Sequence, residues 1–251
     1  MAKNFSLEGY RELVDDLLGR GYRVVGFDEA IPGKPHLILR HDIDMSIQAA
    51  VEMAEVEGSL GVSAHYFVLL RSEMYNPWAP ANIGDLSRIA ALGHAIGLHF
   101  DASLYNSDED LEAAAVAECE ALEAMTGRDV SAISFHRPAP SLQGRAGRFA
   151  GRHHAYEPRF FREMGYCSDS RGGWHHGEPL AQEAVLAGRA LQLLTHPIWW
   201  VGADGAGPVR VLDGFRRNRD RVLAAELARN CEPYRVARGA TPGPLDELKE
   251  A

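Results

Sequence analysis

The sequence predicts an α/β fold, a distorted (β/α) barrel of about seven parallel strands in one chain of 251 residues. Short apolar runs alternate with helical patterns along the chain. The runs are apolar on both faces, which is typical of parallel strands buried between helices. No glycine-rich phosphate loop joins a strand to a helix, and this disfavours a dinucleotide-binding sheet.

The predicted elements follow one another from end to end within a single domain, residues 1–251. Ser6 is a good N-cap, and apolar residues then recur at helical spacing, so the first helix is predicted over residues 6–19. Strands are predicted at 23–27, 37–41, 64–70, 95–100, 132–136, 166–168 and 191–195. Helices are predicted at 46–57, 83–92, 108–125 and 182–187. A C-terminal helix and tail occupy 211–251, and the tail is expected to be exposed.

Composition limits the classes of partner. The formal net charge is −9, which disfavours nucleic acid and anionic lipid as partners. No apolar run is long enough for a membrane span, and the first residues carry acids without an apolar core, so no signal peptide is expected. Three widely spaced cysteines indicate reduced thiols rather than a disulfide framework. We therefore expect a cytoplasmic protein, and the sequence leaves its oligomeric state open.

Polar side chains of a particular kind follow most of the predicted strands. The carboxyl ends of parallel barrel strands meet at one mouth, which is where barrel proteins place their chemistry. Five segments therefore deliver polar groups to one end of the same barrel. They carry Asp42 and Asp44, His99 and Asp101, His136 and Arg137, Asp169, and His196.

The mixture of aspartate and histidine suits a borderline cation such as Zn²⁺. Asp42 and Asp44 are two residues apart, so on an extended chain both point to the same side. Two carboxylates this close repel each other unless a cation or an arginine lies between them. Capping of the following helix is the simpler alternative for both residues.

Five segments in order resemble the motifs of the polysaccharide deacetylase (NodB-homology) family. They begin at Leu39-Arg40-His41-Asp42-Ile43-Asp44 and continue through 93–99, 136–138 and 169–174 to Leu194-Thr195-His196-Pro197. The resemblance covers about residues 37–200 and is closest to the branch with an RHDxD first motif, related to surface-glycan and O-antigen biosynthesis. It implies a distorted barrel, a bound divalent metal, usually zinc, and hydrolysis of an acetyl group on a sugar.

Residue roles follow from the resemblance by position. It implies that Asp42 is the general base and that Asp44 binds the metal. His99 matches the first metal-binding histidine, and Arg137 resembles the arginine that orients the base. His196 matches the histidine that protonates the leaving group.

The first two motifs depart from the family pattern. Ser103 stands where the second motif has its second histidine. Candidates for the third ligand are His136 and then Asp101, because His136 ends a neighbouring strand and imidazole is the commoner zinc ligand. The first motif has an extra residue between its acids, so the roles of Asp42 and Asp44 can also be exchanged.

Loop residues near the strand ends are candidates for substrate binding: Asp169, Trp174, Trp199 and Trp200. The Trp199–Trp200 pair is equally compatible with a packed lid. The expected activity is removal of an acetyl or similar acyl group from a small acylated sugar, a nucleotide sugar or a glycan precursor. The alternatives are an amidohydrolase acting on a non-sugar C–N bond and an inactive glycan-binding member of the family.

Overall fold

The structure is a computed structural model, and it describes residues 5–105, 107–175, 177–202 and 205–239. The chain divides into two compact units, Met1–Gly205 and Ala206–Ala251. Each unit is described by itself. The end of the predicted tail, from residue 240, lies outside the described residues.

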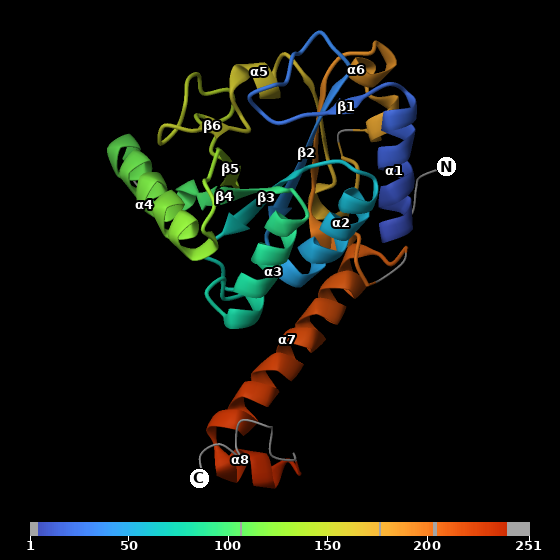
Figure 1. Ribbon diagram of the computed structural model, residues 1–251. Coiled ribbons are helices and arrows are strands. Elements are labelled where there is room, and N and C mark those ends of the chain that lie inside the picture. The colour runs from blue at the N-terminus through green and yellow to red at the C-terminus, as the bar shows by residue number, and fades with distance from the viewer. Residues whose placement is uncertain (1–4, 106, 176, 203–204, 240–251) are drawn as a thin grey trace. The chain divides into compact units, whose positions relative to one another are not determined.

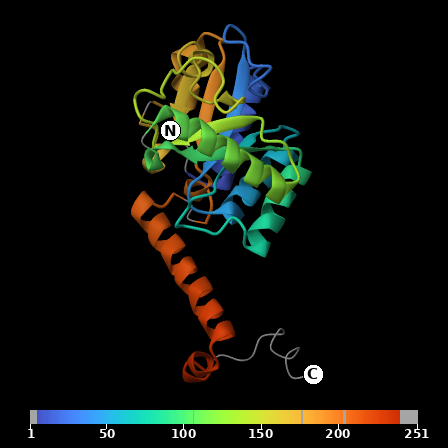
Figure 2. The same ribbon diagram turned by 90° about the vertical axis from the view of Figure 1, so that its left-hand side faces the viewer.

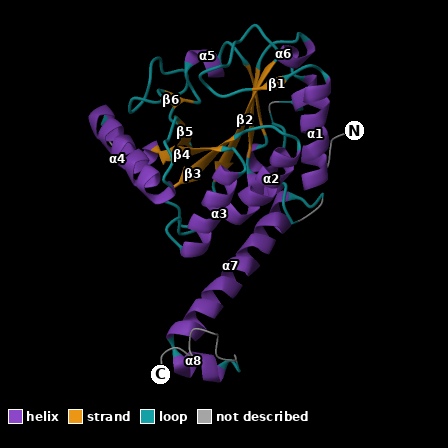
Figure 3. Cartoon of the chain, in the orientation of Figure 1, coloured by secondary structure: helices purple, strands orange, loops and turns teal. Residues whose placement is uncertain are grey.

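The first unit is built on a curled parallel sheet (Figures 1 and 3). The strands run in the order β6-β5-β4-β3-β2-β8-β7, with β1 beside β2, and every pairing is parallel. Among the described strands β6 does not pair with β7, so the sheet is an open half-barrel. This confirms the predicted fold class. The strands are β1 (Arg23–Val24), β2 (His36–Ile43), β3 (His65–Leu69), β4 (Ala95–Asp101), β5 (Ala132–His136), β6 (His153–His154), β7 (Gly165–Ser168) and β8 (Leu191–Thr195).

Helices cover the outer side of this sheet (Figures 1 and 2). Ser6 and Ser46 cap the first two, because their side chains accept hydrogen bonds from Gly9 N and Ala49 N. Pro80 stands in the first turn of α3 and starts that helix three residues before the predicted residue 83. The helices are α1 (Leu7–Gly19), α2 (Ile47–Ser59), α3 (Pro80–Ala91), α4 (Asp108–Thr126), α5 (Pro158–Phe161) and α6 (Glu183–Leu186).

The central strand β2 is buried along its whole length. Successive side chains of a strand point to opposite faces. Arg40 and Asp42 therefore point into the half-barrel, where they contact Ser134 of β5, and His41 points outward to Glu57 of α2. One strand thus supplies polar groups to two separate buried regions.

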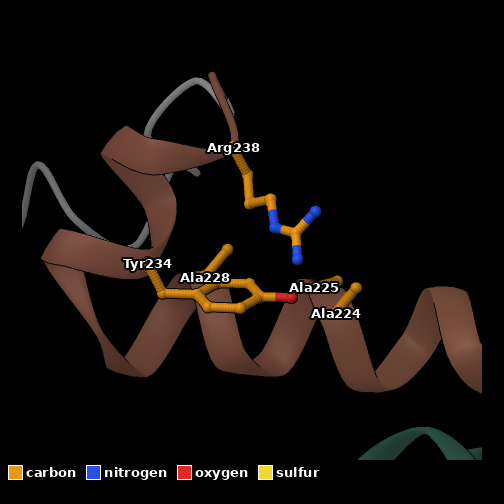
Figure 4. A pocket seen from close by; sticks show the side chains of 5 residues that line it. All are labelled: Ala224, Ala225, Ala228, Tyr234 and Arg238. Carbon is orange, nitrogen blue, oxygen red and sulfur yellow. The ribbon is translucent and has the colours of Figure 1, made fainter.

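The second unit consists of α7 (Pro208–Asn230) and the short α8 (Glu232–Ala237). The two helices enclose a hollow of about 380 Å³, shown in Figure 4, in which Tyr234 and Arg238 lie over Ala224, Ala225 and Ala228 of α7. Of the described helices, none is both long and apolar enough to cross a membrane. All three cysteines are free thiols.

Candidate functional site

Three side chains converge at the carboxyl ends of β2, β4 and β5. His99 Nε2 lies 3.1 Å from Asp44 Oδ1 and 3.1 Å from His136 Nδ1. His136 Nδ1 lies 3.4 Å from the same Asp44 oxygen. These three residues, which we call the ligand cluster, are the group of described residues whose donor atoms are close enough together to share a metal ion.

The donor geometry of the ligand cluster fits a divalent cation. Two ligands bound tetrahedrally to Zn²⁺ at 2.0–2.1 Å lie about 3.3 Å apart, close to all three observed separations. Asp44 Oδ1 is buried and has no hydrogen-bond partner among the described residues, which leaves its lone pairs available. Burial raises the pKa of Asp44, but the neighbouring imidazoles of His136 and His99 outweigh it and hold that pKa well below the usual value. The carboxylate is therefore ionised, as a metal ligand must be.

His136, and not Asp101, joins Asp44 and His99. The Asp101 carboxylate instead accepts hydrogen bonds from Ser103 N at 3.0 Å and from Ser103 Oγ at 2.6 Å. It caps the turn that follows β4. The position where the family pattern has a second histidine is thus a turn residue here, and a histidine of the neighbouring strand completes the group.

Asp42 lies deeper in the half-barrel than Asp44 and is almost fully buried. Arg40 donates to both of its oxygens, from Nε at 3.0 Å and from Nη2 at 2.8 Å. Burial raises the pKa of Asp42, but the positive charge of Arg40 outweighs it and holds that pKa below the usual value. Asp42 is therefore a fixed, ionised carboxylate.

The guanidinium that contacts Asp42 comes from Arg40, whereas the family resemblance implied Arg137. Arg137 is exposed and has a positive φ of 49° directly after β5. Arg40 and Asp42 are two residues apart on one strand, so the pairing is local and needs no loop to deliver the arginine. The RHDxD motif thus carries both the carboxylate and its partner.

His196 lies beside the ligand cluster, and Asp169 holds its ring in place. Its Nδ1 lies 2.6 Å from Asp169 Oδ1, and its Nε2 lies 3.9 Å from Asp44 Oδ2. Burial lowers the pKa of His196, but the charge and hydrogen bond of Asp169 outweigh it and raise that pKa to about 9. At neutral pH His196 is therefore protonated, and its Nε2 faces the cluster.

Asp169, a candidate for substrate binding from its loop position, contacts the ring of His196. It is fully buried, and it also accepts hydrogen bonds from His196 N at 3.0 Å and from Trp200 Nε1 at 2.7 Å. Trp200 is 1% exposed and Trp199 is 7% exposed. The low exposure of this tryptophan pair favours the packed-lid alternative.

The aromatic side chains near the mouth differ in exposure. Trp174 stacks on Phe5, with ring centroids 5.7 Å apart. Trp78, which the sequence did not single out, is 52% exposed on the loop between β3 and α3. That loop is fixed beside the cluster, because Tyr75 donates to Ile43 O at 2.7 Å and Ser72 Oγ donates to Asp44 O at 3.5 Å.

No family model matches the chain, and no curated protein matches it. Solved structures with a similar fold include the Streptococcus pyogenes deacetylase PplD, which is 13% identical over 81% of this chain and 85% of its own, with a TM-score of 0.41. A family 4 carbohydrate esterase from Bacillus anthracis is 14% identical over 95% and 92%, with a TM-score of 0.39. IcaB from Ammonifex degensii is 16% identical over 54% and 69%, with a TM-score of 0.40. The likeness is distant.

Proposed function

We propose that this protein is a metal-dependent hydrolase that removes an acetyl or similar acyl group from an N-acylated sugar or small glycan precursor. The observation that carries the proposal is the convergence of Asp44, His99 and His136 beside the Asp169-held His196. Metal ligands next to a protonated histidine are the parts that hydrolysis of an amide requires. The order of the five sequence motifs supports a sugar amide as the bond.

Asp44, His99 and His136 would hold the ion. When bound, a divalent cation such as Zn²⁺ polarises an acyl carbonyl and lowers the pKa of water from 15.7 towards about 7. Asp42, kept ionised by Arg40, accepts the proton of the attacking water as the general base. Its fixed position means that little reorganisation is needed when the proton moves.

His196 donates a proton from Nε2 to the nitrogen of the leaving amine. Its raised pKa of about 9 keeps it protonated at neutral pH, so the proton is in place before the C–N bond breaks. The buried carboxylate of Asp169 holds the other ring nitrogen and sets the ring orientation. General acid catalysis by such a group contributes typically 10²–10⁴-fold in rate.

The substrates proposed are a small acylated sugar, a nucleotide sugar or a glycan precursor. A cytoplasmic location stays a prediction. The exposed indole of Trp78, on the loop fixed beside Asp44, offers a flat apolar face to a sugar ring.

Acetate release from a panel of N-acetylated sugars and nucleotide sugars, by zinc-reconstituted protein, tests the proposal. His196→Ala should lower turnover about 10³-fold while zinc binding is retained, because the imidazole does not belong to the ligand cluster. Asp42→Asn should lower turnover by a comparable factor, because an amide cannot accept the proton of the attacking water.

The other outcomes separate the alternatives. Release of a different acid from non-sugar amides would favour a general amidohydrolase. Saturable binding of a glycan with no acid released in the presence of zinc would favour an inactive glycan-binding protein. Near-normal turnover by His196→Ala or Asp42→Asn would overturn the assigned roles.

A further inference from the structure

Ser134 lies at the centre of the polar groups beneath the ligand cluster. It is fully buried on β5, and the register of the sheet pairs it with His99 of β4. Its Oγ lies 3.0 Å from His99 Nδ1, 2.5 Å from Arg40 Nη2 and 3.0 Å from each carboxylate oxygen of Asp42. One hydroxyl therefore touches a ligand histidine, the buried carboxylate and the arginine that fixes it.

The hydrogen-bonding capacities of these groups determine where the protons lie. A serine hydroxyl has one proton to donate and two lone pairs that accept, whereas a guanidinium only donates and an ionised carboxylate only accepts. The Ser134 proton therefore goes to Asp42, and one lone pair accepts from Arg40. The remaining lone pair faces His99 Nδ1, so that nitrogen carries a proton and donates it.

This assignment decides the tautomer of His99. A neutral imidazole holds one proton, and a metal binds the nitrogen that lacks it. With the proton on Nδ1, the lone pair lies on Nε2, the atom that is 3.1 Å from both Asp44 Oδ1 and His136 Nδ1. The opposite tautomer would point an N–H at the place where the ligand atoms converge.

We propose that Ser134 is a positioning residue that fixes the Nδ1–H tautomer and the ring orientation of His99, and so prepares the ligand cluster for a divalent cation. The inference rests on the proposed function, because that function supplies the cation. Arg40 and Asp42 act on the ligand through Ser134: Arg40 occupies one lone pair of the hydroxyl and Asp42 takes its proton, which leaves a single acceptor site for His99.

Ser134 is also the group best placed to do this. Asp42 Oδ2 is the other candidate acceptor for His99 Nδ1, but at 3.7 Å it is beyond hydrogen-bond distance. If the hydroxyl were lost, the ring would have to rotate towards Asp42 or exchange its tautomer. Rotation moves Nε2 away from Asp44 and His136, and the other tautomer puts a proton on Nε2 where its lone pair is needed. Loss of outer partners of this kind typically costs 10–100-fold in metal affinity.

The first test compares zinc affinities, measured by competition with a chromophoric chelator on protein that circular dichroism shows to be folded. Ser134→Ala should bind Zn²⁺ at least about tenfold more weakly than the unaltered protein. Ser134→Cys fills the same space with a weak acceptor and should show a similar loss. The matched control is Ser168→Ala, which removes a buried serine of β7 that contacts Ser170 and should leave the affinity unchanged.

The second test reads the tautomer directly, by long-range ¹H–¹⁵N correlation spectra of the imidazoles in metal-free protein. The unaltered protein should show the His99 proton on Nδ1, and Ser134→Ala should shift it towards Nε2. A proton on His99 Nε2 in the unaltered protein, or zinc affinity equal to the unaltered value in both Ser134 variants, would overturn the inference. Absence of zinc binding by the unaltered protein would instead count against the proposed function, and the tautomer would still test Ser134.

Discussion

The strand β2 supplies two buried clusters that differ in one respect. On its inner side the ligand cluster joins Asp44 to His99 and His136 at 3.1–3.4 Å. On its outer side His41 Nε2 lies 2.7 Å from Glu57 Oε1, and its Nδ1 lies 2.7 Å from Thr195 Oγ1. Tyr10 and Tyr66 complete this outer cluster, since each hydroxyl donates to Glu57 at 2.5 Å.

Both clusters place a carboxylate beside histidine, but only in the outer one does each carboxylate oxygen accept a hydrogen bond. Each oxygen of Glu57 accepts at least one hydrogen bond. Asp44 Oδ1 has no hydrogen-bond partner among the described residues. A buried polar atom without a partner costs free energy unless something else binds it. Buried ionisable groups alone therefore do not mark the site, and an unpartnered carboxylate oxygen beside two imidazoles does.

The largest expected effect is that of removing the unpartnered carboxylate. Asp44→Asn should lower turnover by roughly 10³-fold or more, because metal-ion catalysis contributes several kcal/mol and each 1.36 kcal/mol is tenfold. Zinc content of the purified protein should fall in parallel, while the urea midpoint changes little. The matched control is Asp101→Asn, which affects the Ser103 turn and should keep activity within about threefold. Equal losses in both variants would contradict the choice of ligands.

The sequence revealed the inner cluster better than the outer one. Asp44 follows β2, and His99 and His136 lie near the ends of β4 and β5. The apolar runs predicted these three strands, so the strand ends brought the residues together. Asp101, the other candidate ligand, also lies at the end of β4. Its carboxylate accepts a hydrogen bond from Ser103 in the turn that follows and does not join the cluster. That turn depends on side-chain geometry that no periodicity encodes.

Arg40 and Ser134 show which signals the sequence does contain. Both stand two residues from a predicted site residue on the same strand, Arg40 before Asp42 and Ser134 before His136, so both face the same side. The family resemblance implied that Arg137 orients the base, whereas the guanidinium that contacts Asp42 is that of Arg40. The outer cluster gave no comparable signal, because Tyr10 and Glu57 are far apart in sequence and each fits an ordinary helix pattern.

The next largest effect should fall on stability and not on activity. Glu57→Gln removes the charge that faces His41, and breaking one side of a buried pair costs about 3–5 kcal/mol of unfolding free energy. Turnover per folded molecule should stay within about threefold, since Glu57 is not in the ligand cluster. Urea unfolding and turnover by the same preparations check this, and a catalytic loss with unchanged stability would contradict it.

The outer cluster also predicts a pH dependence. Burial raises the pKa of Glu57, but the charge and hydrogen bond of His41 outweigh it and hold that pKa below its ordinary value of 4.5. The stabilisation is therefore complete above pH 4.5 and is lost as the pH falls through the lower, folded-state pKa. Glu55→Gln is the matched control on the same helix, because Glu55 forms a half-exposed pair with Arg88 and should cost less than about 1 kcal/mol.

A smaller effect on stability is expected from His65 of β3, which belongs to neither cluster. Burial, with a contribution from the charge of His41, lowers the pKa of His65 from 6.5 to about 4. As the pH falls, the unfolded chain binds a proton at this histidine before the folded protein does. The free energy of unfolding therefore has its full value above pH 6.5 and falls by about 3 kcal/mol as the pH drops to 4. In His65→Phe the free energy of unfolding should vary less with pH in this window. The control His175→Gln, at an exposed histidine, should keep the pH dependence of the unaltered protein. Parallel curves for the unaltered protein and His65→Phe would contradict the assignment.

The smallest expected effect is that of Trp78→Ala, which tests whether Trp78 belongs to a binding surface around the ligand cluster. Trp78 lies on the loop that Tyr75 and Ser72 fix beside Asp44, and it touches no ligand atom that would alter the chemical step. If a sugar ring covers roughly 50 Å² of its indole, at about 25 cal/mol/Å², Trp78→Ala should weaken binding by about 1 kcal/mol, or about fivefold. We expect KM to rise and kcat to stay constant, since the lost contact exists equally before and during the reaction. Leu186→Ala, which truncates a 71% exposed side chain on α6, should change neither. A fall in kcat with constant KM would place Trp78 with the ligand cluster instead of the binding surface.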